Sequence, residues 1–221
     1  MDAIGWGRLL RATAEINDFF EDDIAFIGGV AVYAHAMMSR DYEGLAVFSH
    51  DADFVIMLNA FADLRDLEVV TPSKNFRKQQ FTKDYFEFDV YVQNQTDLRI
   101  SVEEIVAASE EQYGLRVASL EHLLLLKIPA LKDRKGSQKG EEDAQDIVRI
   151  MYLIDKPDPL KLKRITEDDM LILSEANSLD HILPITNGNR HLAKNLKSVV
   201  ENNFSKISYI SKEVNSSDCE P

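Results

Sequence analysis

Two aspartates, Asp51 and Asp53, stand at the head of an apolar stretch that predicts a β-strand over residues 52–58. Residues i and i+2 of a strand point to the same side, so the two carboxylates are expected to project together. Like charges that close repel each other unless a cation lies between them. Mg²⁺ prefers oxygen ligands and is commonly bound by one or two carboxylates together with substrate phosphates. The pattern therefore indicates either a divalent-metal site or a solvated acidic strand start.

A third carboxylate, Asp89, falls in a predicted strand over residues 85–92, between the apolar residues Phe88 and Val90. A carboxylate inside a sheet is costly without a partner. If this strand pairs beside residues 52–58, Asp89 can join Asp51 and Asp53 in one metal site.

Paired glycines, Gly28 and Gly29, separate a predicted strand over residues 24–27 from a predicted helix over residues 30–38. The first backbone N–H groups of a helix bind anions, and glycine lets a phosphate approach them closely. The pair predicts either a phosphate-binding turn or a tight strand-to-helix connection that has only a structural role.

Basic residues are concentrated in residues 127–139, where one acid, Asp133, faces five cations: Lys127, Lys132, Arg134, Lys135 and Lys139. This stretch is either a triphosphate-binding segment or a solvated basic loop. Lys127 lies on or beside the apolar face of a predicted helix and needs an anion there, which is either a nucleotide phosphate or Asp146. A second basic strip is either a solvated strand or the rim of a substrate site, and consists of Lys74, Arg77, Lys78 and Lys83.

Composition describes a globular protein of 221 residues, of which 45% are hydrophobic and 29% charged. No apolar run is long enough to span a bilayer, the start lacks a signal-peptide pattern, and Cys219 is the single cysteine. We therefore expect a cytoplasmic protein with no membrane partner. Residues 1–115 carry 9 Lys and Arg against 21 Asp and Glu, and residues 116–221 carry 16 against 17, for a net charge of −13. This imbalance disfavours broad nucleic-acid binding and favours a cationic partner or a divalent metal.

The predicted fold is an α/β lobe, a mixed sheet flanked by helices, followed by a C-terminal helical bundle. We place the first domain at residues 1–115, the helical domain at 116–212 and a disordered tail at 213–221. Strands are expected at 24–27, 52–58, 75–82, 85–92 and 115–117. Helices are expected at 3–20, 30–38, 59–67, from 101, at 119–131, 141–154, 166–176 and 190–210, with a loop over 133–140.

The combination of these motifs resembles the nucleotidyltransferase superfamily with the DNA-polymerase-β-type fold. The residues that carry the resemblance are Ile27-Gly28-Gly29, a helix, Arg40, Ser49, Asp51-Ala52-Asp53 and the later Asp89. The downstream part resembles the abortive-infection (AbiEii/AbiGii) toxin branch. Its residues are Leu124-Leu125-Leu126-Lys127, Ala130, Arg134 and Asp143-Ala144-Gln145-Asp146-Ile147.

The resemblance implies metal-dependent transfer of a nucleotidyl group from a nucleoside triphosphate to an acceptor such as tRNA or protein, in a toxin-like enzyme with a possible antitoxin partner. Asp51, Asp53 and Asp89 would be catalytic and would bind Mg²⁺ or Mn²⁺, with Asp89 sharing a second metal or acting as a general base. Nucleotide binding would fall to Gly28, Gly29, Lys127, Arg134, Asp143 and Asp146. In this set Asp143 and Asp146 would orient Lys127 and Arg134, or Asp143 would assist catalysis.

Two alternatives stay open. A small-molecule nucleotidyltransferase of the aminoglycoside-modifying type fits the net charge of −13 better than an RNA acceptor does. A non-catalytic protein that binds a nucleotide or a partner on the same fold is supported by two residues and by an apparent insertion from Tyr42 to Phe48, which lengthens the gap between Gly29 and Asp51. Ala52 stands where the family has a larger aliphatic residue, and Glu142 stands where it has a basic one.

Overall fold

The computed structural model describes residues 2–39, 43–74 and 78–217, which form two compact units. Unit 1 comprises Met1–Met38 and Ala46–Ser119, and unit 2 comprises Ser39–Leu45 and Leu120–Pro221. The sequence places one boundary after residue 115, whereas the structure divides the chain after Ser119. It also assigns the short segment 39–45, which lies within the first predicted domain, to the second unit. Arg40, Arg77 and Cys219 lie outside the described residues.

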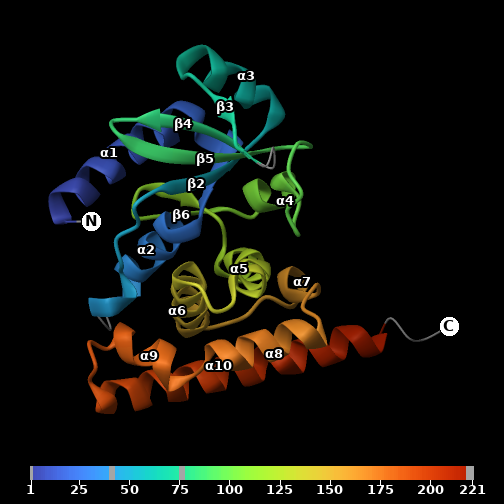
Figure 1. Cartoon of the computed structure of the whole chain (residues 1–221). Coiled ribbons are helices and arrows are strands. Elements are labelled where there is room, and N and C mark those ends of the chain that lie inside the picture. The colour runs from blue at the N-terminus through green and yellow to red at the C-terminus, as the bar shows by residue number, and fades with distance from the viewer. Residues whose placement is uncertain (1, 40–42, 75–77, 218–221) are drawn as a thin grey trace. The chain divides into compact units, whose positions relative to one another are not determined.

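Unit 1 contains one mixed sheet of seven strands among the described residues, flanked by helices (Figure 1). Its strand order is β3-β4-β5-β2-β1-β7-β6. The pairs β2–β5 and β1–β7 are parallel, and the other neighbours are antiparallel. The mixed sheet with flanking helices confirms that part of the predicted fold. The elements are α1 (Ala3–Phe20), η1 (Glu21–Asp23), β1 (Ile24–Ile27), α2 (Gly28–Ser39), β2 (Ala52–Ile56), α3 (Leu58–Leu67), β3 (Thr71–Pro72), β4 (Gln79–Lys83), β5 (Phe86–Val92), α4 (Val102–Ala107), β6 (Glu110–Gln112) and β7 (Leu115–Val117).

The centre of the sheet is held by a row of aromatic side chains. Phe54 of β2 is fully buried, with its ring centroid 5.5 Å from that of Phe26 on β1 and 6.3 Å from that of Phe81 on β4. Phe81 in turn stacks on Phe88 of β5 at 5.0 Å. Aromatic and β-branched residues suit a pleated surface covered on its inner face, so this row fixes which face of each strand is buried.

The hairpin between β4 and β5 turns through Asp84 and Tyr85, which both have positive φ angles of 51° and 72°. Two such residues in succession match a type I′ turn, whose twist suits a two-residue hairpin. The turn fixes the register, pairing Lys83 with Phe86 and, further along, Gln80 with Asp89. The strand expected at 75–82 begins at Gln79 in the structure, and residues 75–77 lie outside the described part of the chain.

Every regular element in the described part of unit 2 is a helix. Its elements are η2 (Glu43–Leu45), α5 (Leu120–Arg134), α6 (Gln138–Leu153), α7 (Pro159–Leu162), α8 (Glu167–Ala176), α9 (Leu179–Ile185) and α10 (Arg190–Ser217). The helix α8 starts with a capping box, in which the Thr166 side chain accepts from the Asp169 N–H and the Asp169 carboxylate accepts from the Thr166 N–H. None of the described helices combines the length and apolar character needed to cross a membrane.

Three predictions for unit 2 need correction. The loop expected over 133–140 shrinks because α5 continues to Arg134 and the Ser137 side chain caps α6 by accepting from the Gly140 N–H. The helices α7 and α9 were not predicted. The tail expected from residue 213 is still helical to Ser217, and residues 218–221 lie outside the described part of the chain.

The aromatic row predicts a large effect of Phe54→Ala on the free energy of unfolding. Removing a fully buried ring leaves a cavity, and such truncations cost about 3–5 kcal/mol. Phe19→Ala is the matched control, because the Phe19 side chain is 57% exposed and its loss is expected to cost no more than about 0.5 kcal/mol. Urea unfolding of both variants measures the difference, and equal midpoints would show that the row does not support the sheet.

Candidate functional site

The two aspartates and the two glycines singled out in the sequence meet at the first turn of α2. Gly28 has a φ of +65°, and a Cβ built on it would lie 2.5 Å from Asp53 Oδ2. A Cβ on Gly29 would lie 2.8 Å from Ser49 Oγ. The Ser49 hydroxyl donates to Asp51 Oδ1 over 3.0 Å. Glycine is thus required at this turn both by the backbone conformation and by the polar side chains packed against it.

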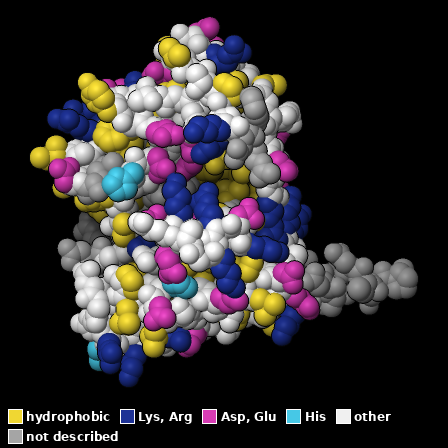
Figure 2. Space-filling model, in the orientation of Figure 1, with side chains coloured by type: hydrophobic (Ala, Val, Ile, Leu, Met, Phe, Trp, Pro, Cys, Tyr) yellow, Lys and Arg dark blue, Asp and Glu magenta, His cyan; other side chains and the backbone are white. Residues whose placement is uncertain are grey.

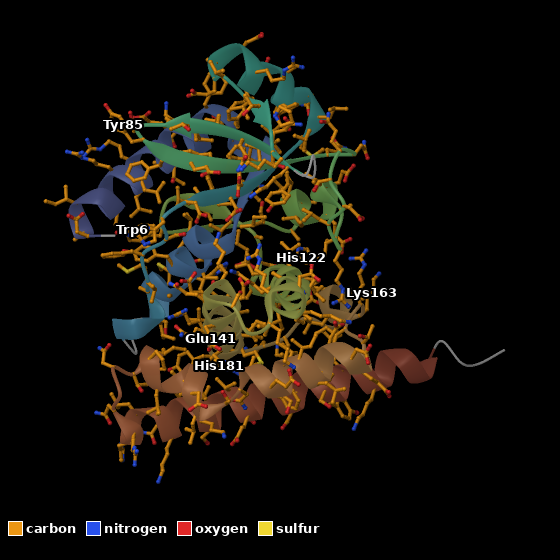
Figure 3. The ribbon with its side chains drawn as sticks, viewed as in Figure 1. Trp6, Tyr85, His122, Glu141, Lys163 and His181 are labelled. Carbon is orange, nitrogen blue, oxygen red and sulfur yellow. The ribbon has the colours of Figure 1, made fainter. Side chains whose placement is uncertain are left out.

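The loop that delivers Ser49 and Asp51 is anchored by aromatic packing. Phe48 stacks on Trp6 of α1 with ring centroids 5.4 Å apart and an interplanar angle of 17°. Trp6, labelled in Figure 3, also packs edge-on against Tyr33 of α2 at 4.6 Å. The pairing of Phe48 with Trp6, which is far away in the chain, leaves no local signal in the sequence.

Asp53 and Asp89 are direct neighbours across the parallel strands β2 and β5. The same lateral row continues from Asp53 to Ile27 on β1 and from Asp89 to Gln80 on β4. Residues paired in register point to the same face of a sheet, so the two carboxylates share one face. The expected pairing of the two aspartate-bearing strands is therefore present.

Asp89 is 5% exposed, and both of its carboxylate oxygens accept hydrogen bonds. The ammonium of Lys78 binds Oδ2, and Gln80 Nε2 donates to Oδ1 over 2.7 Å. Lys78 belongs to the basic strip whose role the sequence left open between a solvated strand and a substrate rim. The structure gives it a specific partner, whereas Lys83 pairs with Glu15 and Glu68.

The donor chemistry of Asp51 and Asp53 fits a hard divalent cation. Both are carboxylates that are partly exposed, and the second oxygen of Asp51 has no hydrogen-bond partner among the described residues. No group of three or more His, Cys, Asp or Glu side chains in the described part of the chain is arranged to hold a metal ion. Metal binding by all three aspartates therefore stays a prediction.

Unit 2 contains a separate chain of ion pairs between α5 and α6. Lys127 Nζ lies 2.8 Å from Asp143 Oδ1 and 2.8 Å from Asp146 Oδ2. Arg134 Nη1 lies 3.1 Å from Asp143 Oδ2, and Arg149 Nη1 lies 2.8 Å from Asp146 Oδ1. We call these five residues the ion-pair chain. Every oxygen of its two carboxylates is occupied by a basic group of unit 2.

Gly140 allows this arrangement, because a Cβ there would collide with the carbonyl oxygen of Arg134. The first turn of α6 consequently lies against the end of α5, and Asp143 follows one turn later, 3% exposed. Sequence reasoning left Lys127 a choice between phosphates and Asp146, and the resemblance predicted that Asp143 and Asp146 orient Lys127 and Arg134. In the structure Asp143 contacts both of these bases, and Asp146 contacts Lys127. Contact of Lys127 and Arg134 with a nucleotide stays a prediction.

The pKa of Lys127 is raised above its ordinary value of 10.5. Burial by itself lowers this pKa, but the attraction of Asp146 and Asp143 and their hydrogen bonds outweigh the burial. Lys127 is therefore a fixed positive charge at physiological pH and does not act as a proton donor or acceptor there.

Unit 2 also has a pocket of about 690 Å³ with apolar walls formed by residues such as Leu131, Leu171 and Ile172. Its rim carries two ion pairs, His181 Nε2 with Glu141 Oε2 at 3.1 Å and Lys135 Nζ with Glu175 Oε2 at 2.7 Å. The labelled side chains of Glu141 and His181 point toward each other in Figure 3. No sequence pattern indicates this pocket, because its residues come from four helices and from the turn between α5 and α6.

No family model matches the sequence, and no curated protein matches it. Among solved structures, an antigenic nucleotidyltransferase-like protein from Paracoccidioides brasiliensis is similar, with 17% identity, a TM-score of 0.47 and coverage of 91% of this chain and 94% of that one. The protein JHP933 from Helicobacter pylori is similar with 13% identity, a TM-score of 0.46 and coverage of 98% and 94%. At these scores neither likeness bears on the function of this chain.

The turn at Gly28 predicts that Gly28→Ala destabilises unit 1 more than an ordinary substitution at a positive φ. The left-handed backbone conformation costs a residue with a Cβ about 1–2 kcal/mol. At Gly28 the new methyl group must also displace Asp53. Gly114→Ala is the matched control, because Gly114 has a φ of +73° with nothing within 4 Å of its Cβ position. Urea unfolding is expected to give Gly28→Ala a lower free energy of unfolding than Gly114→Ala. Equal free energies would contradict the close contact between Gly28 and Asp53.

The ion-pair chain predicts a pH dependence for Lys127→Met. Breaking a buried ion pair by removing one partner typically costs about 3–5 kcal/mol. Because the folded-state pKa of Lys127 is raised, its contribution is fully present below the unfolded-state value of 10.5 and is lost only as the pH rises through the higher folded-state value. Unfolding free energies from pH 6 to 11 should therefore show a constant deficit of the variant up to about pH 10. A deficit that vanished near neutral pH would refute the assignment.

Proposed function

We propose that the protein is a metal-dependent nucleotidyltransferase and that its site lies at the first turn of α2. The observation that carries the proposal is the convergence of Asp51, Asp53 and Ser49 on Gly28 and Gly29. Carboxylates that favour a divalent cation thus lie beside backbone N–H groups that favour phosphate. A nucleoside triphosphate chelated by a divalent metal combines both ligands.

The residues of unit 1 have distinct roles in this proposal. Asp51 and Asp53 would hold Mg²⁺ or Mn²⁺, and Ser49 orients Asp51 by donating to one of its oxygens. The absence of a Cβ at Gly28 and Gly29 lets Asp53 and Ser49 lie against the turn, and the backbone N–H groups of the turn would bind a phosphate. Asp89, beside Asp53, remains the predicted third carboxylate. The metal, when bound, would neutralise phosphate charge and polarise the phosphoryl group for attack.

For unit 2, taken by itself, we propose that Lys127 and Arg134 bind nucleotide phosphates. Arg134 has a side chain that is 49% exposed, and it can bind phosphate oxygens in a forked geometry. Lys127 keeps a fixed charge, and Asp143 and Asp146 hold both cations in place. We infer that Asp143 and Asp146 act as positioning residues for these bases.

For the acceptor, the sequence resemblance favours a hydroxyl or phosphate on tRNA or protein, in a toxin-like enzyme with an antitoxin partner. The net charge of −13 favours a cationic small molecule of the aminoglycoside type. On the face shown in Figure 2, acidic and basic side chains are interspersed, so a polyanion and a polycation both find local partners there. A transfer assay with all three acceptor classes is therefore needed.

The proposed site predicts that Asp53→Asn abolishes transfer without unfolding the protein. Loss of a carboxylate that holds the metal removes several kcal/mol of charge stabilisation, which corresponds to a rate at least about a hundredfold lower. The assay follows radiolabel from each α-labelled triphosphate, with Mg²⁺, to total tRNA, to protein and to aminoglycosides. Thermal unfolding checks that the variant is folded.

Asp63→Asn is the matched control, because Asp63 is an exposed carboxylate on α3 of the same unit. It changes the net charge equally and should transfer label at the wild-type rate. A wild-type rate for Asp53→Asn would overturn the assignment. Binding of triphosphate and Mg²⁺ without transfer to any acceptor would support the alternative of a non-catalytic binding protein.

A further inference from the structure

Asp89 already carries a cation supplied by the protein itself. The Lys78 ammonium binds its Oδ2 and the Gln80 amide donates to its Oδ1, so both oxygens are engaged within unit 1. The Asp89 side chain is 7% exposed and that of Lys78 is 29% exposed. This carboxylate therefore differs from Asp51, whose Oδ2 has no hydrogen-bond partner among the described residues.

The backbone holds this ion pair in place from both sides. Gln80 is the register partner of Asp89 in the β4–β5 hairpin. Lys78 lies two residues before Gln80, on the same side of the extended chain. The Lys78 carbonyl accepts a hydrogen bond from the Ser73 N–H over 2.9 Å, just before β4 begins. The backbone hydrogen bonds of the hairpin thus fix the position from which the Lys78 ammonium binds Asp89.

The position of the ion pair matters because Asp53 is the other lateral neighbour of Asp89. Two carboxylates side by side on one sheet face repel each other, and the ammonium offsets one of the two charges. A second divalent ion at Asp89 would have to displace Lys78 and would then leave that ammonium close to the metals. The ion pair and a second metal therefore exclude each other.

We propose that Lys78 is the resident cation of this site and occupies the place of a second metal, so that the chain binds one divalent ion, through Asp51 and Asp53. This inference rests on the proposed function and narrows it. Lys78 acts as a positioning residue that holds the Asp89 carboxylate in its orientation beside Asp53. Asp89 is then not a metal ligand in the wild-type protein.

The test counts bound Mn²⁺ by electron paramagnetic resonance and by isothermal titration, with each of the four α,β-methylene nucleoside triphosphates present. The wild type is expected to bind one Mn²⁺ beyond that bound by the nucleotide in buffer. Lys78→Met is expected to gain a second Mn²⁺ site, or to tighten a second site at least tenfold. Lys83→Met is the matched control, because it removes a cation from β4 whose partners are Glu15 and Glu68, and it should keep one site.

Asp89→Asn, combined with Lys78→Met, gives a second readout, because the double variant removes the whole ion pair and leaves the net charge beside Asp53 unchanged. If Asp89 is not a ligand, the affinity of the single Mn²⁺ site in this double variant stays within about threefold of the wild type. A loss of tenfold or more would show that Asp89 binds the metal and would overturn the inference.

The outcomes separate this inference from the proposed function. Two Mn²⁺ ions in the wild type, or an unchanged count in a folded Lys78→Met, would refute the role of Lys78 and leave the proposed function intact. No Mn²⁺ beyond the nucleotide's own, together with an unchanged count in Asp53→Asn, would refute the proposed function itself. One ion in the wild type that is lost in Asp53→Asn supports both.

Discussion

The sheet of unit 1 places Asp53 and Asp89 side by side, and the surrounding structure compensates their two negative charges. Apolar strands surround the pair, because Phe54, Phe88 and Val90 are fully buried. Asp53 turns its carboxylate toward the first turn of α2, where the helix dipole is positive. Asp89 instead receives the Lys78 ammonium and the Gln80 amide. The same constraint thus explains the glycine turn on one side and the basic residue before β4 on the other.

The two units balance charge in different ways. Unit 1 leaves the carboxylates of Asp51 and Asp53 partly exposed, and these carboxylates favour an incoming cation, whereas the helix N-terminus beside them favours an anion. In the ion-pair chain of unit 2 three basic side chains surround two carboxylates, so that cluster is already cationic by one charge. An anion is the ligand that such an excess favours.

Much of the site could be predicted because its signals are local. The spacing of Asp51 and Asp53 and the alternation around Asp89 follow from the period of a strand. The partner of Asp89 was within reach as well, since counting back from a two-residue turn at Asp84 and Tyr85 pairs it with Gln80. Neither residue is the asparagine or glycine that usually marks such a turn. The two strands were therefore predicted without the register that pairs them.

Other features depend on contacts that leave no local pattern. The packing of Phe48 on Trp6 joins segments from different elements. Helix α7 has only four residues, and α9 has seven and contains Pro184, so neither shows a helical period long enough to recognise. The extension of α5 to Arg134 follows from its packing on α6 through Gly140, which tertiary structure decides rather than propensity.

The segment with η2 is part of unit 2 although it lies between α2 and β2 in the chain. Gly44 sits so close to the Ile185 carbonyl that no side chain fits there, and its own carbonyl accepts from Arg149 Nε over 3.2 Å. Segments of the two units therefore alternate along the chain, and the units cannot be inherited as independent modules. A recombination event that joined residues 1–119 to a different helical partner would leave this segment without its contacts to Ile185 and Arg149. Lineages of this protein are consequently expected to exchange the two units together or not at all.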